Sequence, residues 1–214
     1  MQSKRLRDKV KDDYNTIADA FSKTRQSDWK EFDVFVPYLR PGMEVLDLGC
    51  GNGRLVDFLK RFQVKTYLGA DQSEGLIALA QKAHPDLDFE VWDMASPPKL
   101  LQKWDAIFMI ASFHHLPKED QKQVLAWALS HLKPRGHLFM TNWNLFQFRF
   151  WKAWLKACLW PKWGFKGLEI PWNNGVRRYY YAFSSRELRG LLRRGGFEIL
   201  EEQNGRNFVT IARV

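Results

Sequence analysis

Residues 44–53 decide the fold, because they read Glu-Val-Leu-Asp-Leu-Gly-Cys-Gly-Asn-Gly, a short apolar run followed by three spaced glycines. The run is typical of a buried strand, and Leu55, Phe58 and Leu59 then follow at helical spacing. Glycines allow a tight turn and let a ligand approach the backbone closely. The stretch therefore predicts a strand, a ligand-binding loop and a helix, with the loop at the carboxyl end of the strand.

Strands and helices alternate beyond this loop. The expected strands lie at 64–70, 88–92, 106–111 and 137–142, and the expected helices at about 73–84 and 118–132. Two apolar runs at 197–203 and 208–214, joined by Asn204-Gly205, predict a terminal antiparallel hairpin. This order predicts an α/β, Rossmann-like, mostly parallel sheet with helices on both faces.

Two segments lie outside the alternation. Residues 1–40 predict polar helices, which we interpret as a helical lid, with an apolar stripe at Tyr14, Ile17, Ala18 and Phe21. Residues 143–183 form an aromatic, basic insertion, since six of the ten tryptophans lie between 143 and 172. We expect one domain over residues 1–214.

Composition limits the class of protein. With 214 residues and 45% hydrophobic content the chain can build a core, which excludes disordered and fibrous classes. Its net charge of +9 makes an anionic partner plausible. Cys50 and Cys158 are far apart, so we expect neither a disulfide framework nor a metal site. We also expect a cytoplasmic protein without an integral membrane segment, since no apolar run reaches roughly 18 residues.

Two carboxylates define the expected ligand. Asp71 ends the second strand, 18 residues beyond Gly53, where a carboxylate can accept hydrogen bonds from both ribose hydroxyls of a nucleoside. By itself Asp71 could instead cap the next helix. The spacing Gly-x-Gly-x-Gly differs from a dinucleotide fingerprint, and Asp47 precedes it. An acidic loop repels a pyrophosphate and favours an ammonium group.

The glycine loop resembles the first motif of the class I S-adenosylmethionine-dependent methyltransferases, Val-Leu-Asp-Leu-Gly-Cys-Gly-x-Gly, at residues 45–53. The resemblance runs from about residue 40 to the end, with later motifs at 110–116 and 132–138. Arg135 stands where a Gly is more usual, in an expected surface turn.

The resemblance implies S-adenosylmethionine as the cofactor, with Asp71 on the ribose, Asp93 and Met94 beside the adenine, and the backbone of 49–53 on the methionine portion. The expected cofactor-binding residues are Asp47, Gly49, Cys50, Gly51, Asn52, Gly53, Asp71, Gln72, Asp93, Met94 and Ile110.

His114 and His115 follow shortly after the fourth expected strand. A histidine near its ordinary pKa can deprotonate an acceptor hydroxyl, so His114 is a candidate general base. Alternatively, both histidines only fix the end of the strand and the start of the following helix.

Two segments outside the alternating strands and helices resemble the eukaryotic tRNA wobble-uridine carboxymethyl methyltransferases. Residues 13–25 with Trp29 resemble their leader, and residues 178–183 resemble a substrate-side segment, with Tyr181 in place of a usual His. Those enzymes esterify the carboxylate of 5-carboxymethyluridine, and the resemblance allows an activating partner subunit. It implies methyl transfer to an acceptor that needs no general base. The expected carboxylate-binding and substrate residues are Arg25, Arg178, Tyr14, Tyr179 and Trp143. Alternatively, the aromatic residues pack a lid and Arg178 is a solvated surface charge.

The charge and aromatic content of the insertion also indicate which anionic partner the protein binds. No acidic residue occurs from 121 to 168, while eight Lys and Arg do, which suits tRNA phosphates and stacked bases. However, Arg149, Lys152 and Lys156 share one helical face beside Trp151 and Leu155, as in a helix on anionic lipid. The alternatives are a quinone or lipid methyltransferase at a membrane surface and an inactive RNA-binding protein, though the intact motifs argue against the latter.

Overall fold

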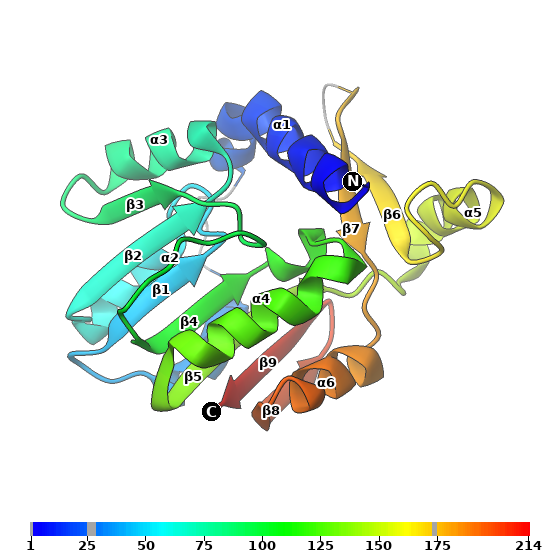
Figure 1. Cartoon of the computed structure of the whole chain (residues 1–214). Coiled ribbons are helices and arrows are strands. Elements are labelled where there is room, and N and C mark those ends of the chain that lie inside the picture. Colours follow the sequence, from blue (N-terminus) through cyan, green and yellow to red (C-terminus); the bar gives the residue numbers. More distant parts are fainter. Residues whose placement is uncertain (1, 25–28, 173–174) are drawn as a thin grey trace.

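A seven-stranded sheet forms the centre of the computed structural model, which describes residues 2–24, 29–172 and 175–214. Its strands are β1 (Glu44–Leu48), β2 (Thr66–Asp71), β3 (Asp88–Val91), β4 (Trp104–Ile110), β5 (Leu132–Trp143), β8 (Glu198–Asn204) and β9 (Asn207–Arg213). Their order is β3-β2-β1-β4-β5-β9-β8 (Figure 1). The first five are parallel, and β9 pairs antiparallel with both β5 and β8. The α/β fold and its terminal hairpin are therefore confirmed.

Two apolar cores cover the two faces of this sheet. In β4, Ile107 and Met109 point into one core and Ala106 and Phe108 into the other, because side chains alternate along a strand. The first core contains side chains from α4 (Lys118–His131) and α6 (Ser185–Arg194). The second contains side chains from the 3₁₀ segment η1 (Lys30–Tyr38), α2 (Leu55–Leu59) and α3 (Glu74–Ala83). Burial on both faces explains the continuous apolar run of β4. Short 3₁₀ turns complete the chain at η2 (Lys60–Phe62), η3 (Phe113–His115) and η4 (Phe148–Phe150).

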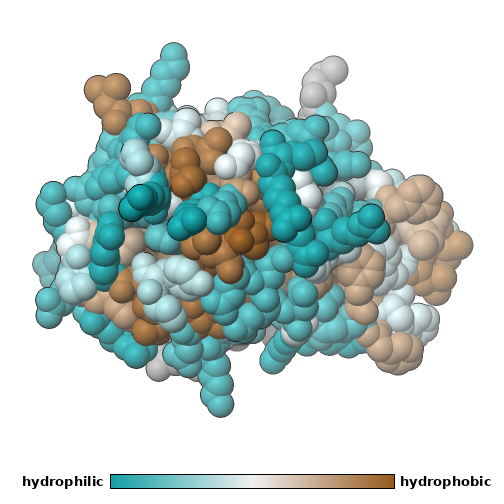
Figure 2. All heavy atoms as spheres, turned by 90° about the horizontal axis from the view of Figure 1, so that it is seen from below, coloured by the Kyte–Doolittle hydropathy of each residue, from teal (hydrophilic) through white to brown (hydrophobic). Residues whose placement is uncertain are grey.

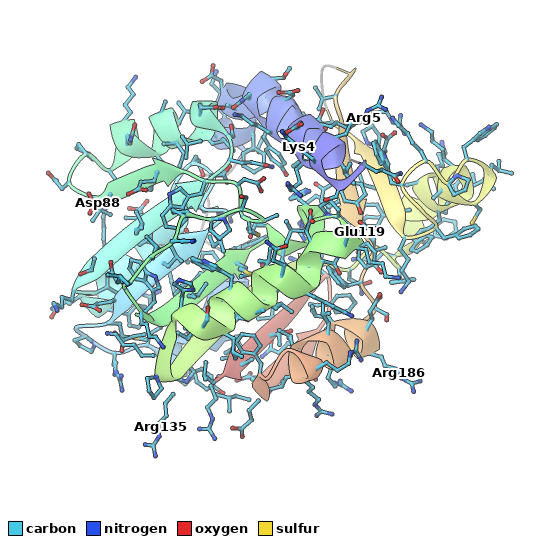
Figure 3. All side chains as sticks on the ribbon, in the orientation of Figure 1. Lys4, Arg5, Asp88, Glu119, Arg135 and Arg186 are labelled. Atoms are coloured by element: carbon cyan, nitrogen blue, oxygen red, sulfur yellow. The ribbon has the colours of Figure 1, made fainter. Side chains whose placement is uncertain are left out.

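Strand β5 begins five residues earlier than the sequence predicts. A register shift between Trp104 and Ala106 lets Leu132 pair with Trp104 before the regular ladder starts at His137. Arg135 is exposed there with a positive φ of 64°. Figure 3 shows its side chain pointing away from the molecule, at the end opposite to the first helix, which agrees with a surface turn.

The N-terminal helix α1 (Gln2–Lys23) lies across the carboxyl ends of the parallel strands, between α3 and β7 (Arg177–Tyr181) (Figure 1). Asn15 fixes it there, because its Oδ1 accepts hydrogen bonds from Ser73 Oγ at 2.6 Å and from the Gly75 N–H at 3.2 Å. Lys11 pairs with Glu74. The helix thus covers the edge of the sheet where the glycine loop ends β1.

The insertion contains structure that the sequence analysis did not predict. After α5 (Trp151–Leu159), β6 (Gly167–Pro171) and β7 form a separate two-stranded antiparallel sheet. Four of the five β7 residues are buried although they read Arg-Arg-Tyr-Tyr-Tyr, so no alternation of polar and apolar residues marks this strand. Both cysteines carry free thiols. Within the described residues, no helix has the length and apolar character needed to cross a bilayer.

Candidate functional site

A cavity of about 570 Å³ lies at the carboxyl ends of β1, β2 and β4, beneath α1. It gathers most of the predicted site residues, namely Tyr14, Asp47, Gly49, Cys50, Gly51, Asn52, Asp71, Gln72, Asp93, Met94, Ile110, His114, Trp143 and Arg178. Arg25 lies outside the described residues. Gly53 and Tyr179 do not line the cavity.

The glycine loop needs Gly49 for close packing. Gly49 has a φ of +86°, and a Cβ there would lie 2.2 Å from Ser112 Cβ, nearer than any real contact. Ser112 in turn donates a hydrogen bond to the Leu48 carbonyl at 2.9 Å. The loop is therefore held against the end of β4, and its backbone faces the cavity.

Gly53 packs on the side of the loop that faces away from the cavity. A Cβ on Gly53 would lie 3.1 Å from the His84 ring and 3.3 Å from the Phe89 ring, and the residue has a φ of +78°. Its role is to let the chain turn over these two rings. Gly53 thus packs against these rings and does not line the cavity, and its expected cofactor contact stays a prediction.

Asp71 is held by backbone amides. Its Oδ2 accepts from the Gly51 N–H at 3.0 Å and its Oδ1 from the Ser73 N–H at 2.9 Å. Burial raises the pKa of the carboxyl, and these amides oppose that rise. Each oxygen keeps acceptor capacity for a ribose hydroxyl. Ser73, not Asp71, caps α3, because Ser73 Oγ accepts from the Leu76 N–H.

Asp47 carries an unsatisfied oxygen. The residue is 1% exposed, and Tyr67 donates to its Oδ2 at 3.0 Å, while Oδ1 is buried without a hydrogen-bond partner among the described residues. Burial raises the pKa of Asp47 to about 7. A bound ammonium group would supply the missing partner and favour the ionised carboxylate.

Asp93 and Met94 form the third part of the site. Asp93 Oδ1 accepts from the Ala95 N–H, and Oδ2 pairs with Arg7 Nε at 2.8 Å. Met94 lies over the glycine loop, since its Cε is 3.1 Å from the Cβ position of Gly49. The described residues thus fit S-adenosylmethionine, with Asp47 for its ammonium, Asp71 for its ribose, and Asp93 with Met94 for its adenine. Nothing in the local sequence marked Arg7.

Arg178 brings a buried positive charge to the same cavity. It is 2% exposed, and its Nη1 donates to Tyr14 Oη at 3.2 Å. Its guanidinium carbon lies 4.3 Å from the centre of the Trp172 ring and 5.6 Å from that of Trp143. Its Nε has no hydrogen-bond partner among the described residues, and no described carboxylate forms an ion pair with it. Arg178 is therefore not a solvated surface charge.

The residues beside Arg178 correct the expectation that Tyr179 belongs to the substrate site. Adjacent residues of a strand face opposite sides, so Arg178 and Tyr179 cannot line the same cavity. Tyr180 lines the wall instead, with its ring 5.3 Å from the Arg178 guanidinium carbon. The Tyr179 side chain is buried on the other side, beside Trp163.

A chain of hydrogen bonds links Arg178 to His115. His115 Nδ1 lies 2.6 Å from the Tyr179 carbonyl and must donate to it, so in the neutral ring Nε2 accepts from the Tyr14 hydroxyl at 2.8 Å. Tyr14 is then free to accept from Arg178. Burial and the charge of Arg178 lower the pKa of His115 to about 3.

His114 also stays neutral. It is 1% exposed, its Nδ1 accepts from the Trp143 N–H at 3.2 Å, and burial together with His115 and Arg178 lowers its pKa well below the ordinary value. A group with so low a pKa is a poor general base. The geometry therefore favours the structural interpretation of both histidines, although both line the cavity.

Several cations surround the opening. Lys30, Arg149 and Arg206 line the cavity and are exposed, and none of them forms an ion pair with a described residue. Arg149 and Arg206 line the same opening, and burial together with the charge of Arg206 lowers the pKa of Arg149. An anion at the opening would relieve their repulsion.

Comparison with known proteins agrees with this geometry. Residues 21–202 match the family described as methyltransferase domain. A tRNA (carboxymethyluridine(34)-5-O)-methyltransferase of Saccharomyces cerevisiae is 30% identical over 135 residues, which cover 63% of this chain and 47% of that protein. The Schizosaccharomyces pombe protein of the same name is 25% identical over 213 residues, 88% of each chain. The match with the Saccharomyces protein thus spans about half of that relative.

Solved structures show the same fold. A S-adenosylmethionine-dependent methyltransferase of Methanosarcina mazei has a TM-score of 0.71 at 22% identity, covering 84% of this chain and 96% of its own. A putative methyltransferase of Haloferax volcanii, solved with the Trm112 methyltransferase activator, has a TM-score of 0.72 at 16% identity and covers 95% and 96% of the two chains.

Proposed function

The chain belongs to the methyltransferase domain family, and from this premise we propose that it methylates the carboxylate of a carboxymethyluridine in tRNA, with S-adenosylmethionine as the methyl donor. When bound, this cofactor supplies an electrophilic methyl group. The acceptor carboxylate is already an anion at neutral pH, so no proton has to be removed from it. The protein has to bind, orient and desolvate the acceptor.

The observation that carries the proposal is the buried Arg178. An arginine that is 2% exposed and forms no ion pair with a described carboxylate brings a buried charge to the cavity, which the Asp13 carboxylate offsets only from beyond ion-pair distance. Its planar fork matches the two oxygens of a carboxylate. Trp143 flanks the guanidinium and is only partly buried, so its ring could stack on a base, while the buried Tyr180 supports it by stacking at 4.9 Å between ring centres. The neutral His114 and His115 fit an acceptor that needs no base.

The tRNA part of the proposal has two supports. The cations Lys30, Arg149 and Arg206 lie at the opening, where the phosphates of a nucleic acid could bind while one nucleotide enters. The two fungal relatives carry the name of a tRNA carboxymethyluridine methyltransferase. We also propose an activating protein subunit, on the precedent of the Haloferax complex, and a cytoplasmic location.

One incubation tests the acceptor. The full chain is given labelled S-adenosylmethionine and, separately, tRNA bearing carboxymethyluridine, a lipid extract or quinone precursors. We expect the label in tRNA, as the methyl ester of carboxymethyluridine in nucleoside mass analysis. Label only in lipid or quinone would replace the proposal with a second candidate, a quinone or lipid methyltransferase at a membrane surface. The exposed apolar side chains of residues 146–165 favour that candidate.

A further inference from the structure

Helix α5 turns an apolar stripe outward. Trp151, Leu155 and Leu159 follow one another at i, i+4 and i+8 and are 47%, 51% and 59% exposed. The opposite side of the helix holds it to the protein, since Ala157 is buried and Trp154 Nε1 donates to the Leu145 carbonyl at 2.8 Å. A surface helix of a soluble domain normally packs its apolar face against the core and exposes its polar face.

The neighbouring segments enlarge this apolar stripe. Phe148 is 86% exposed, Trp160 69%, Phe165 66% and Phe146 52%. Of the ten large hydrophobic residues that are exposed in the described part of the chain, seven lie between 146 and 165. We call these seven residues the α5 surface. Figure 2 shows hydrophobic side chains gathered at the right-hand end of the molecule, where α5 lies in Figure 1.

Cations border the α5 surface. Lys152 and Lys156 lie on the helix itself, with Arg149 before it and Lys162 after it. Glu169 is the first carboxylate beyond residue 120, and it lies 3.6 Å from both Lys156 and Lys162. Lys152 forms no ion pair with a described residue. The surface therefore joins a net positive charge to exposed apolar groups.

Two kinds of polyanion could attract these cations, and the apolar groups distinguish them. Single-stranded RNA is bound through flat rings on which its bases stack, and the exposed leucines 155 and 159 offer no such ring. A lipid surface takes up leucine, phenylalanine and tryptophan side chains alike, while lysines bind anionic headgroups. We propose that the α5 surface docks the protein peripherally on a membrane containing anionic lipid.

The α5 surface is separate from the cavity. None of residues 151–165 lines the cavity, and Arg149 is the residue nearest to α5 that does so. Membrane docking is therefore independent of the proposed methyl acceptor, and each can be tested without the other.

Flotation with vesicles tests the docking. The full chain is mixed with vesicles of phosphatidylcholine alone or with about 30 mol% phosphatidylglycerol. We expect flotation with the anionic vesicles, weaker flotation with neutral ones, and a shift of tryptophan emission to shorter wavelength. Leu155→Ser with Leu159→Ser should lower the partition coefficient at least about tenfold, and Lys152→Glu should lower binding to anionic vesicles only.

Two exposed positions outside the α5 surface supply matched controls. Leu101 is fully exposed, so Leu101→Ser changes an exposed leucine elsewhere. Arg186 points outward from α6 (Figure 3), so Arg186→Glu reverses a charge elsewhere. Both controls should float like the wild type. Failure of the wild type to float with anionic vesicles, or unchanged flotation of the leucine double variant, would overturn the proposal. So would loss of tRNA affinity in that variant with lipid binding intact, which would identify an RNA-binding surface.

Discussion

Arg178 Nη1 donates a hydrogen bond to Tyr14 Oη at 3.2 Å and so joins two residues that lie 164 positions apart in the chain. Tyr14 comes from the helix over the cavity, and Arg178 from the inserted hairpin. The bond orients a buried guanidinium whose remaining N–H groups have no carboxylate partner among the described residues. The two segments added to the central sheet thus meet at the group that we assign to the acceptor.

Replacing Arg178 by lysine tests its fork geometry. Arg178→Lys keeps the charge but loses the paired donors, so kcat/KM on carboxymethyluridine tRNA should fall about tenfold to a hundredfold. Affinity for tRNA should stay within about twofold, because it depends on many phosphate contacts. Arg177→Lys is the matched control, since Arg177 lies beside Glu169 and does not line the cavity. Full turnover by Arg178→Lys would remove Arg178 from the site.

Tyr14→Phe removes one hydroxyl and with it the link between Arg178 and His115. The hydroxyl makes two hydrogen bonds, each worth about 1 kcal/mol, so we expect a loss of about fivefold to thirtyfold in kcat and little change in cofactor affinity. Tyr38→Phe likewise removes one hydroxyl, which donates to Glu201 and does not line the cavity, so it should leave kcat unchanged. Equal activity of the two variants in steady-state assays would show that Tyr14 does not position Arg178.

Asp47 makes cofactor binding depend on pH. Its pKa is raised to about 7, so below this value the carboxyl is protonated and binds an ammonium group poorly. Calorimetry should show affinity for S-adenosylmethionine rising from pH 6 to pH 8, and Asp47→Asn should abolish this rise. The same shift acts on stability, because the native state binds the proton more tightly than the unfolded state. The contribution of Asp47 to stability therefore decreases as pH rises from about 4 to about 7. A flat affinity profile in the wild type would contradict the assignment.

Alanine substitutions at Gly49 and Gly42 distinguish the energetic cost of a steric clash from the cost of a positive φ alone. Both have a positive φ, but a Cβ on Gly49 would meet Ser112, whereas one on Gly42 meets nothing within 4 Å. Gly42→Ala should cost roughly 1 kcal/mol of unfolding free energy through its backbone alone. Gly49→Ala should cost more in denaturant unfolding and should also weaken cofactor binding. Equal costs would show that the contact with Ser112 is not required.

Local patterns in the sequence predicted the cofactor side of the site. The loop at 49–53, the strand before it and Asp71 at the end of β2 are all set by neighbours in sequence, and alternation fixes which strands are parallel. The ion pair of Arg7 with Asp93 joins residues 86 positions apart, and only the packing of α1 creates it. No local pattern could indicate it.

The substrate side was harder to predict, because the sequence Arg-Arg-Tyr-Tyr-Tyr of β7 does not indicate which of its side chains face the cavity. The resemblance singled out Arg178 and Tyr179, and the structure lines the cavity with Arg178 and Tyr180 instead of Tyr179. Which of several similar side chains faces inward depends on the pairing of β7 with β6, and this pairing appears only in the folded hairpin.

The most direct test of the carboxylate assignment compares two forms of one tRNA, bearing either carboxymethyluridine or its neutral amide. The two acceptors have nearly the same shape, but only the first carries the anion that Arg178 is proposed to bind. With labelled S-adenosylmethionine and mass analysis of the nucleosides, we predict methyl ester on the carboxymethyl form and no label on the amide. Label at equal rates at another atom of both tRNAs would contradict the proposal that a carboxylate held by Arg178 accepts the methyl group.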